Sequence, residues 1–226
     1  MKVQKKFLHH HPFDPFLPVG ITHIIVGTLP PPRFSTGKLK PGDVNFSYGS
    51  IDGQLWPILE RIYDLTLSYE TTPAAVIQRK QFLMRHKIGI CDIVSHCYRN
   101  KIDASDVGMQ QVVLRDFFHY LAQVPSAQTL LFTGGGSKNG PEYFFRKYLG
   151  TQKKELQQLD SGVPRLHSFQ FQGRMLTTYS LTAPSGAANR AIGRMAAYKK
   201  QKKENPNYTT IDFRVAQYAQ VFPKPY

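Results

Sequence analysis

The residue types best suited to chemistry gather in residues 22–56, THIIVGTLPPPRFSTGKLKPGDVNFSYGSIDGQLW. The later part of this stretch places Phe46, Tyr48, Gly49 and Asp52 on what we expect to be an irregular loop. Aromatic rings beside glycines suit a flat ligand, because a ring face can stack on it and glycine lets the backbone approach closely. A carboxylate beside such a ligand could orient water or steady a positive charge, worth roughly 2–4 kcal/mol when well placed. For Asp52 the alternative is a hydrogen bond within the loop, and both interpretations stand.

A short strand and a stiff turn come before that loop. Ile24, Ile25 and Val26 form an apolar, β-branched run that is typical of a strand covered on both faces. Gly27 ends the run, and the prolines at 30–32 fix the path of the chain after it. By itself this turn would be a plain proline-rich connection. Ligands of open α/β sheets bind beyond the carboxyl ends of strands, however, and the aromatic loop that follows favours a pocket here.

Three further candidate functional segments each have a structural interpretation as well as a functional one. Asp92, expected in a buried strand at residues 89–94, could be a catalytic acid, but buried acids more often bind loop amides. The GGGSK run at residues 134–138 lacks the spacing of a phosphate-binding P-loop. It predicts a tight turn from strand to helix, where Ser137 and Lys138 could contact a phosphate of a bound polyanion. Ser185 is not flanked by the glycines that a nucleophile elbow requires.

The histidines and cysteines do not match a metal or redox site. Cys91 and Cys97 are separated by five residues, a spacing of neither zinc nor redox motifs, and two cysteines are too few for an iron–sulfur cluster. Buried, reduced thiols are expected instead. His9, His10 and His11 could look like a metal site, but with no matching ligand cluster nearby we expect residues 1–20 to be an extended segment laid over the core. We therefore expect no metal and no cofactor.

The charge balance points to a polyanionic partner. Lys and Arg number 29 against 15 Asp and Glu, a formal net charge of +14, which favours nucleic acid over the alternative of an anionic membrane surface. No apolar run approaches the length of a membrane-spanning helix, and the N-terminus lacks the hydrophobic segment of a signal peptide. We expect a cytoplasmic monomer in which residues 1–226 form one domain.

Strands and helices are expected to alternate along the chain. Strands are predicted at residues 24–26, 89–94, 129–132, 166–171 and 175–181, and helices at 54–65, 72–86, 106–124 and 141–148. A basic helical region follows at 199–226, its last helix near 211–222. This pattern predicts an α/β fold with a mostly parallel sheet, and it places the loops at Gly27, Gly134 and Pro184 on one rim.

Four segments in this order resemble the uracil-DNA glycosylase superfamily: GTLPPPRF, FSYGSIDGQLWPIL, GICDIV and APSGAANR. The likeness is greatest to its mismatch-specific uracil and hypoxanthine branches. The resemblance implies a three-layer αβα sandwich and a monofunctional glycosylase that flips uracil or hypoxanthine out of DNA and removes it with water. It implies no metal, no cofactor and no Schiff-base lysine.

The resemblance also assigns residues. Tyr48 would stack on the flipped base, with Phe46 as second choice. The first loop would line the base pocket through Gly27, Thr28, Leu29, Pro30 and Pro31. The last loop would press into the duplex through Pro184, Ser185, Gly186, Ala187, Asn189 and Arg190, the arginine reaching a phosphate or the gap.

The sequence departs from the superfamily at three catalytic positions. Leu29 stands where Asn or Asp usually positions the water, Gly53 where the hypoxanthine branch has Asn, and Ala183 where His or Asn often opens the last loop. Cleavage through an oxocarbenium-like transition state tolerates such losses when a carboxylate lies nearby. Asp52 is the first candidate for that role, followed by Asp43 and Asp92. The alternatives are a member of the fold that binds nucleic acid or nucleotides without catalysis, and an enzyme of free nucleosides or nucleotides.

Overall fold

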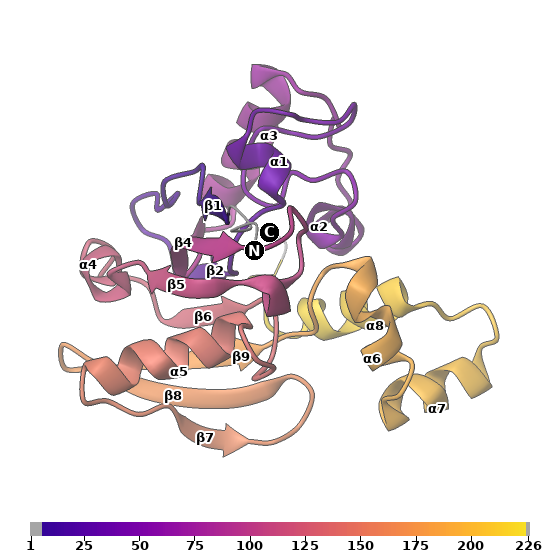
Figure 1. Ribbon diagram of the computed structural model, residues 1–226. Coiled ribbons are helices and arrows are strands. Elements are labelled where there is room, and N and C mark those ends of the chain that lie inside the picture. Colours follow the sequence, from indigo (N-terminus) through magenta and orange to yellow (C-terminus); the bar gives the residue numbers. More distant parts are fainter. Residues whose placement is uncertain (1–5, 225–226) are drawn as a thin grey trace, which may run out of the picture.

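A six-stranded sheet forms the centre of the computed structural model, which describes residues 6–224 (Figure 1). The strand order is β3-β2-β6-β9-β8-β7. The strand bounds are β2 His23–Val26, β3 Ile88–Ile90, β6 Thr129–Phe132, β7 Gln157–Asp160, β8 Arg165–Phe171 and β9 Arg174–Ser180. The pairs β3–β2, β2–β6 and β6–β9 are parallel, whereas β9–β8 and β8–β7 are antiparallel. The predicted α/β class with a mostly parallel sheet is confirmed.

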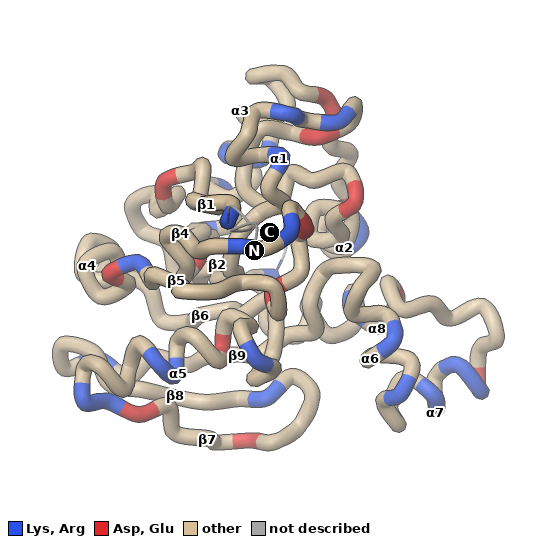
Figure 2. Tube along the Cα trace, viewed as in Figure 1, with Lys and Arg blue, Asp and Glu red and all other residues tan. Residues whose placement is uncertain are grey.

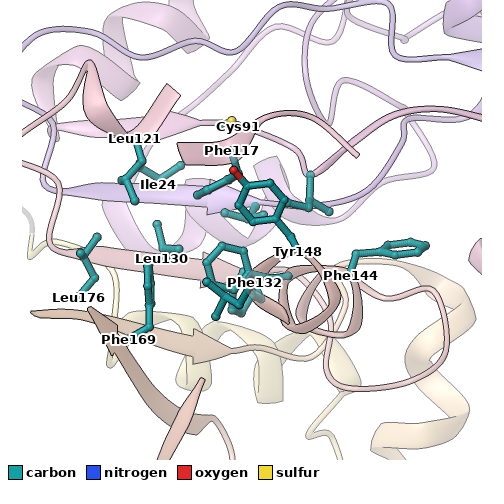
Figure 3. Packing of buried hydrophobic residues seen from close by; sticks show 14 of the residues in the cluster. Ile24, Cys91, Phe117, Leu121, Leu130, Phe132, Phe144, Tyr148, Phe169 and Leu176 are labelled. Atoms are coloured by element: carbon teal, nitrogen blue, oxygen red, sulfur yellow. The ribbon is translucent and has the colours of Figure 1, made fainter. Parts of the chain in front are cut away.

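The alternation of side chains along the strands creates a layer on each face of the sheet. Ile24 and Leu130 point into one cluster, which α4 (Phe117–Ala122) and α5 (Pro141–Thr151) cover. Figure 3 shows part of this cluster, with Phe132, Tyr148 and Phe169 among the packed rings. Ile25 and Leu131, the next residues on the same two strands, point into a second cluster. This cluster is covered by α2 (Leu55–Tyr63), α3 (Pro73–Arg85) and α8 (Thr210–Ala219). The arrangement is a three-layer sandwich.

A second, antiparallel sheet lies on the α4–α5 side. It has the order β1-β4-β5, with β1 Phe7–His10, β4 Val94–Arg99 and β5 Gln110–Leu114. The N-terminal segment is thus a strand paired with β4, and His9 within it is fully buried. Arg99 Nε donates to His9 Nδ1 at 2.9 Å, and burial followed by the charge of Arg99 lowers the pKa of His9 to about 4.

The predicted helix at residues 106–124 is wrong. Residues 106–108 form one 3₁₀ turn (η1, Asp106–Gly108), and β5 and the short α4 follow. The run Val112–Val113 is β-branched and pairs with β4, which outweighs the helical spacing of the apolar residues. The helix cap in this region is Asp116, whose side chain accepts from the His119 amide.

The predicted strand at residues 89–94 is also wrong in its extent. β3 ends at Ile90 and β4 begins at Val94, so Asp92 lies in the connection between two strands of different sheets. This placement leaves the Asp92 carboxylate free to reach neighbouring loops.

The helix starts follow the local sequence. Thr72 caps α3 and Pro73 occupies its first turn, as predicted, and Thr209 with Asp212 forms a capping box at α8. Between the last strand and α8 the chain forms α6 (Asn189–Ile192) and α7 (Ala196–Glu204), which lie to one side of the sheet in Figure 1. Within residues 6–224 we find no helix with the length and apolarity needed to cross a membrane.

Phe46 lies in the core and does not line the cavities described below. Its ring packs edge-on against Phe16, with centroids 5.8 Å apart, and contacts Trp56 at 6.4 Å. Its role as second choice for base stacking therefore gives way to a packing role.

We expect Phe46→Ala to lower stability by about 3–5 kcal/mol, since it removes a buried ring from a close-packed cluster. In a chain of this size the melting temperature should fall by roughly 6–20 °C. Thermal unfolding followed by circular dichroism measures this. A melting temperature within the error of the unmodified protein would contradict the packing role.

Candidate active site

Strand register brings the functional loops together. Val26, Phe132 and Ser180 are aligned across β2, β6 and β9, so the loops that follow these strands begin side by side. After β2 the chain first adds β3 on one side of that strand and later adds β6 on its other side. The order of the strands therefore reverses between β2 and β6. A switch point of this kind opens a crevice at the carboxyl ends of the strands.

A cavity of about 470 Å³ occupies this crevice. Its walls include Gly27, Thr28, Leu29, Pro30, Pro31, Tyr48, Asp52, Asp92, Asp106, Thr133, Ala183, Pro184, Ser185, Gly186 and Ala187. The first and last loops predicted from the sequence therefore face each other across one cavity. The loop that carries Tyr48 is joined to the last loop by backbone: Gly53 pairs with Ser185, and Gln54 N donates to Pro184 O at 2.9 Å.

Asp92 ties three segments of the chain together beside this cavity. Its Oδ1 accepts from the Gly27 amide at 2.7 Å and from the Tyr48 hydroxyl at 3.0 Å. Its Oδ2 lies 2.9 Å from Nε2 of His11, and both side chains are almost fully buried. The carboxylate fixes the start of the first loop, the aromatic ring and the N-terminal segment at once.

The hydrogen bonds of His11 define its tautomer. The Phe13 amide donates to His11 Nδ1 at 3.2 Å, so Nδ1 carries no proton. Nε2 must then carry it and donate to Asp92. His11 is therefore a neutral donor to the carboxylate, a role that the sequence did not reveal.

Tyr48 is held by close contacts that require glycine opposite it. A Cβ on Gly27 would lie 2.3 Å from the Tyr48 hydroxyl and 2.8 Å from Asp92 Oδ1. Tyr48 itself has a φ of 57°, which is costly for a bulky residue, and its hydroxyl also lies 3.1 Å from Thr133 Oγ1. Burial, together with the nearby Asp92, raises the pKa of Tyr48 well above its usual range. The ring packs partly against the core and partly lines the cavity.

Asp106 is a second carboxylate at the cavity, and sequence reasoning missed it. The sequence predicts only a helix beginning at this residue. In the structure the Thr28 hydroxyl donates to Asp106 Oδ1 at 2.8 Å, and Asn139 Nδ2 donates to the Asp106 backbone carbonyl at 2.9 Å. Burial raises the pKa of Asp106, against the lowering effects of the Thr28 hydrogen bond and the charge of Arg99. A carboxyl with a raised pKa beside a cavity is a candidate for acid–base chemistry.

The other two acids proposed from the sequence have different surroundings. Asp43 is fully buried and lies outside the cavity. Burial alone would raise its pKa, but hydrogen bonds from Arg33 and from the Ile51 and Lys40 amides hold the pKa at about 2. Asp43 therefore stabilises the loop that carries Tyr48.

Asp52 lies at the cavity rim with its side chain 61% exposed. A hydrogen bond from Lys40 Nζ, 2.8 Å away, keeps its pKa below the usual range, and Arg33 Nη2 lies 3.3 Å away. The geometry supports both a rim carboxylate that faces the ligand and the loop-bracing alternative.

The last loop is clamped from behind by α8. Arg214 is fully buried and donates to the carbonyls of Ala183 and Ser185, both at 2.8 Å, and to Asn189 Oδ1 at 2.9 Å. Gln217 Oε1 accepts from the amide and hydroxyl of Thr182, and the Tyr218 hydroxyl donates to Thr182 O. The only sequence signal for this clamp is the spacing of these polar residues on one face of an otherwise apolar helix.

A second cavity of about 430 Å³ adjoins the first. The two share Asp106, Thr133 and Ala183. Ser137 lines the second cavity, whereas Lys138 is exposed and lines neither. Asn189 Oδ1 accepts hydrogen bonds from Arg214 and from the Thr210 hydroxyl. Arg190 is exposed on α6. Among the proposed DNA-contacting residues, Lys138 and Arg190 are thus free to meet a ligand outside the cavities.

Comparison with known proteins supports the architecture. A solution NMR structure of a proposed uracil DNA glycosylase from Methanosarcina acetivorans superimposes on this chain with a TM-score of 0.52. The match covers 92% of this chain and 98% of that one, at 16% sequence identity. The chain therefore shares the fold of that protein. No protein-family model matches the sequence, and no curated protein matches it. The likeness at this identity concerns the fold.

We expect Gly27→Ala to disrupt the site while leaving the fold intact. The added methyl would displace the Tyr48 hydroxyl and the Asp92 carboxylate, breaking the hydrogen bonds that join them. Near-ultraviolet circular dichroism and ligand binding should both change, with the far-ultraviolet spectrum unaltered. Gly150→Ala is the matched control, because a Cβ there meets nothing within 4 Å. Equal behaviour of the two variants would contradict the close packing.

We expect Asp106→Asn to stabilise the protein at neutral pH. The folded pKa of Asp106 lies above its unfolded value, so its contribution to stability is present at low pH and is lost as pH rises through the folded pKa. The amide carries no charge and its oxygen can still accept from Thr28. The melting temperature of the variant should exceed that of the unmodified protein at pH 7, and the difference should shrink as the pH falls. A difference that grows as pH falls would overturn the assignment.

Proposed function

We propose that the protein is a monofunctional DNA glycosylase that flips a deaminated base, uracil or hypoxanthine, into the first cavity and releases it by hydrolysis. The observation that carries this proposal is the cavity at the switch point, where the Tyr48 ring and the carboxylates of Asp92 and Asp106 meet. A flipped base needs a π-face and exclusion of water to offset its lost stacking, and Tyr48 offers the face.

Asp92 gives a physical reason for preferring uracil and hypoxanthine to their parent bases, cytosine and adenine. A carboxylate has about four lone-pair sites, and Gly27, Tyr48 and His11 occupy three of them. The remaining site accepts an N–H. Uracil and hypoxanthine carry an N–H on the ring where cytosine and adenine carry an unprotonated nitrogen, which a carboxylate repels. The same site therefore favours uracil over cytosine and hypoxanthine over adenine, the bases from which they arise.

The chemistry falls to a carboxylate and water. As the C1′–N bond breaks, its electron pair leaves with the base and the sugar gains oxocarbenium character. Water forms the new C1′–O bond and gives up a proton to the ionised Asp106 carboxylate. The departing base anion then takes up one proton, from Asp106 directly or through water, so Asp106 is again ionised at the end of the reaction. Leu29 and Ala183 lack proton chemistry, so Asp106 takes the role usually expected of the first loop, with Asp52 as a rim carboxylate.

The cavity wall offers no amine for a Schiff base. None of the described residues that line the first cavity is a lysine. The expected product is therefore an intact strand with an abasic site.

The basic surface favours DNA over a free nucleoside. Figure 2 shows Lys and Arg gathered on α6 and α7, next to the last loop. The exposed cations there are Arg190, Arg194, Lys199, Lys200, Lys202 and Lys203. A small substrate does not need so broad a cationic surface, whereas phosphates along a duplex do, and binding should weaken steeply with salt.

A binding-only member of the fold is the second candidate function. Leu29, Gly53 and Ala183 favour it, because all three positions lack the side chains that the superfamily uses for catalysis. Such a protein would bind the duplex or a nucleotide without releasing a base.

Single-turnover cleavage of end-labelled duplexes tests the proposal, with uracil, hypoxanthine, xanthine or unmodified cytosine at the target position and alkaline workup. We expect product from a deaminated base and none from cytosine. Tyr48→Ala and Asp106→Asn should each lower the rate by about 10²-fold or more.

Asp64→Asn is the matched control, because Asp64 lies at the end of α2 with a φ of 52°, a conformation that Asn tolerates. Its rate should equal that of the unmodified protein. No product from any duplex, together with tight and salt-sensitive binding, would favour the binding-only function.

A further inference from the structure

The connection between β4 and β5 carries two exposed apolar side chains. Ile102 and Val107 are each 70% exposed, on a loop of otherwise polar or small residues, NKIDASDVG. Isolated apolar residues on a surface need no explanation by themselves. These two flank Ala104 and Asp106, which line the first cavity, and so they stand at its rim.

The backbone of this loop is held firmly from below. Arg99, which is 1% exposed, donates to Ser105 O at 2.6 Å, and its guanidinium lies 3.6 Å from Asp103 Oδ1. Asn139 Nδ2 donates to the carbonyls of Asp106 and Met109. The chain thus fixes the loop through buried polar groups while it leaves two branched side chains in water.

The last loop, on the opposite rim, has no large apolar side chain: Arg190, the long side chain beyond it, is charged and lies on α6. The last loop runs Ala183, Pro184, Ser185, Gly186, Ala187, Ala188. The resemblance described above assigns this loop the task of pressing into the duplex, but Gly186 and Ala187 at its exposed part are too small to fill the space of a base. Bulk and apolarity are on the other side of the cavity, at Ile102 and Val107.

Base flipping leaves a gap in the stack, and apolar side chains inserted between base steps can fill it. We propose that Ile102 and Val107 form the wedge that enters the duplex and replaces the flipped base. The proposal rests on the proposed function, and it moves the gap-filling role from the last loop to the β4–β5 connection. The braced backbone keeps the wedge rigid, and the small residues of the last loop let the strand pass close to the opposite wall.

The test compares the double variant Ile102→Ala/Val107→Ala with the unmodified protein on duplex and single-stranded substrates that carry the same target base. A wedge acts only where a stack must be opened. We expect the single-turnover rate on duplex to fall 10- to 100-fold and the rate on single strands to stay within twofold. Ile102→Leu should keep the duplex rate, since leucine retains the apolar bulk.

A duplex with 2-aminopurine beside the target base reports the opened stack without chemistry. Its fluorescence should rise when the unmodified protein binds at saturating concentration, and the double variant should abolish the rise. Val19→Ala/Leu159→Ala is the matched control, because those side chains are 103% and 53% exposed and lie outside the lining of both cavities. The control should behave as the unmodified protein.

Two results would overturn the wedge: an unchanged fluorescence rise in the double variant, or an equal loss of rate on duplex and single strands. Absence of any fluorescence rise with the unmodified protein would also overturn it. If no base is released but the rise is present and the double variant loses it, the wedge stands and the glycosylase proposal fails. The two proposals thus fail separately.

Discussion

The Asp92 carboxylate is the interaction on which the site depends. It joins the amide that begins the first loop, the hydroxyl of Tyr48 and the imidazole of His11, groups that are remote in the sequence. Loss of the acceptor would leave the buried Gly27 amide and the His11 imidazole unsatisfied, and the Tyr48 hydroxyl would keep only Thr133. The cost of such unsatisfied groups exceeds the net value of the bonds. The position of the aromatic ring, and so the width of the cavity, follows from this one side chain.

Three arginines share the task of holding the loops around the cavity. Arg33 braces the loop that carries Tyr48 through Asp43, Arg99 the β4–β5 connection through Ser105, and Arg214 the last loop through Ala183 and Ser185. Arg99 and Arg214 are almost fully buried. Arg99 donates to Ser105 O and to His9 Nδ1, whereas the planar guanidinium of Arg214 acts as a fork that fixes several carbonyl oxygens at once. Irregular backbone around an open cavity is thereby given a defined shape without regular secondary structure.

The sequence predicted well what depends on local pattern. The β-branched run at Ile24 and the cap at Thr72 fix a strand and a helix start through the residues themselves, and proline and glycine placed the first loop. The helix expected from Asp106 failed because pairing with β4, remote in sequence, outweighed the apolar spacing. Asp106 and Arg214 could not be assigned for the same reason: their partners, Thr28 and Ala183, are far along the chain. Phe46 and Tyr48 are two residues apart, and only packing decides which of them faces the core.

The clamp on α8 has a consequence for the order in which the protein matures. The sheet strands that carry the cavity end at Ser180, whereas the side chains that fix the last loop, Arg214, Gln217 and Tyr218, are translated after them. Chains emerge from the ribosome N-terminus first, so the sheet can form while this wall of the site is still loose. A nascent chain, or a product truncated before α8, would hold the aromatic ring but not the loop opposite it. Competence to grip a ligand is therefore acquired only after α8 has been synthesised, later than the sheet.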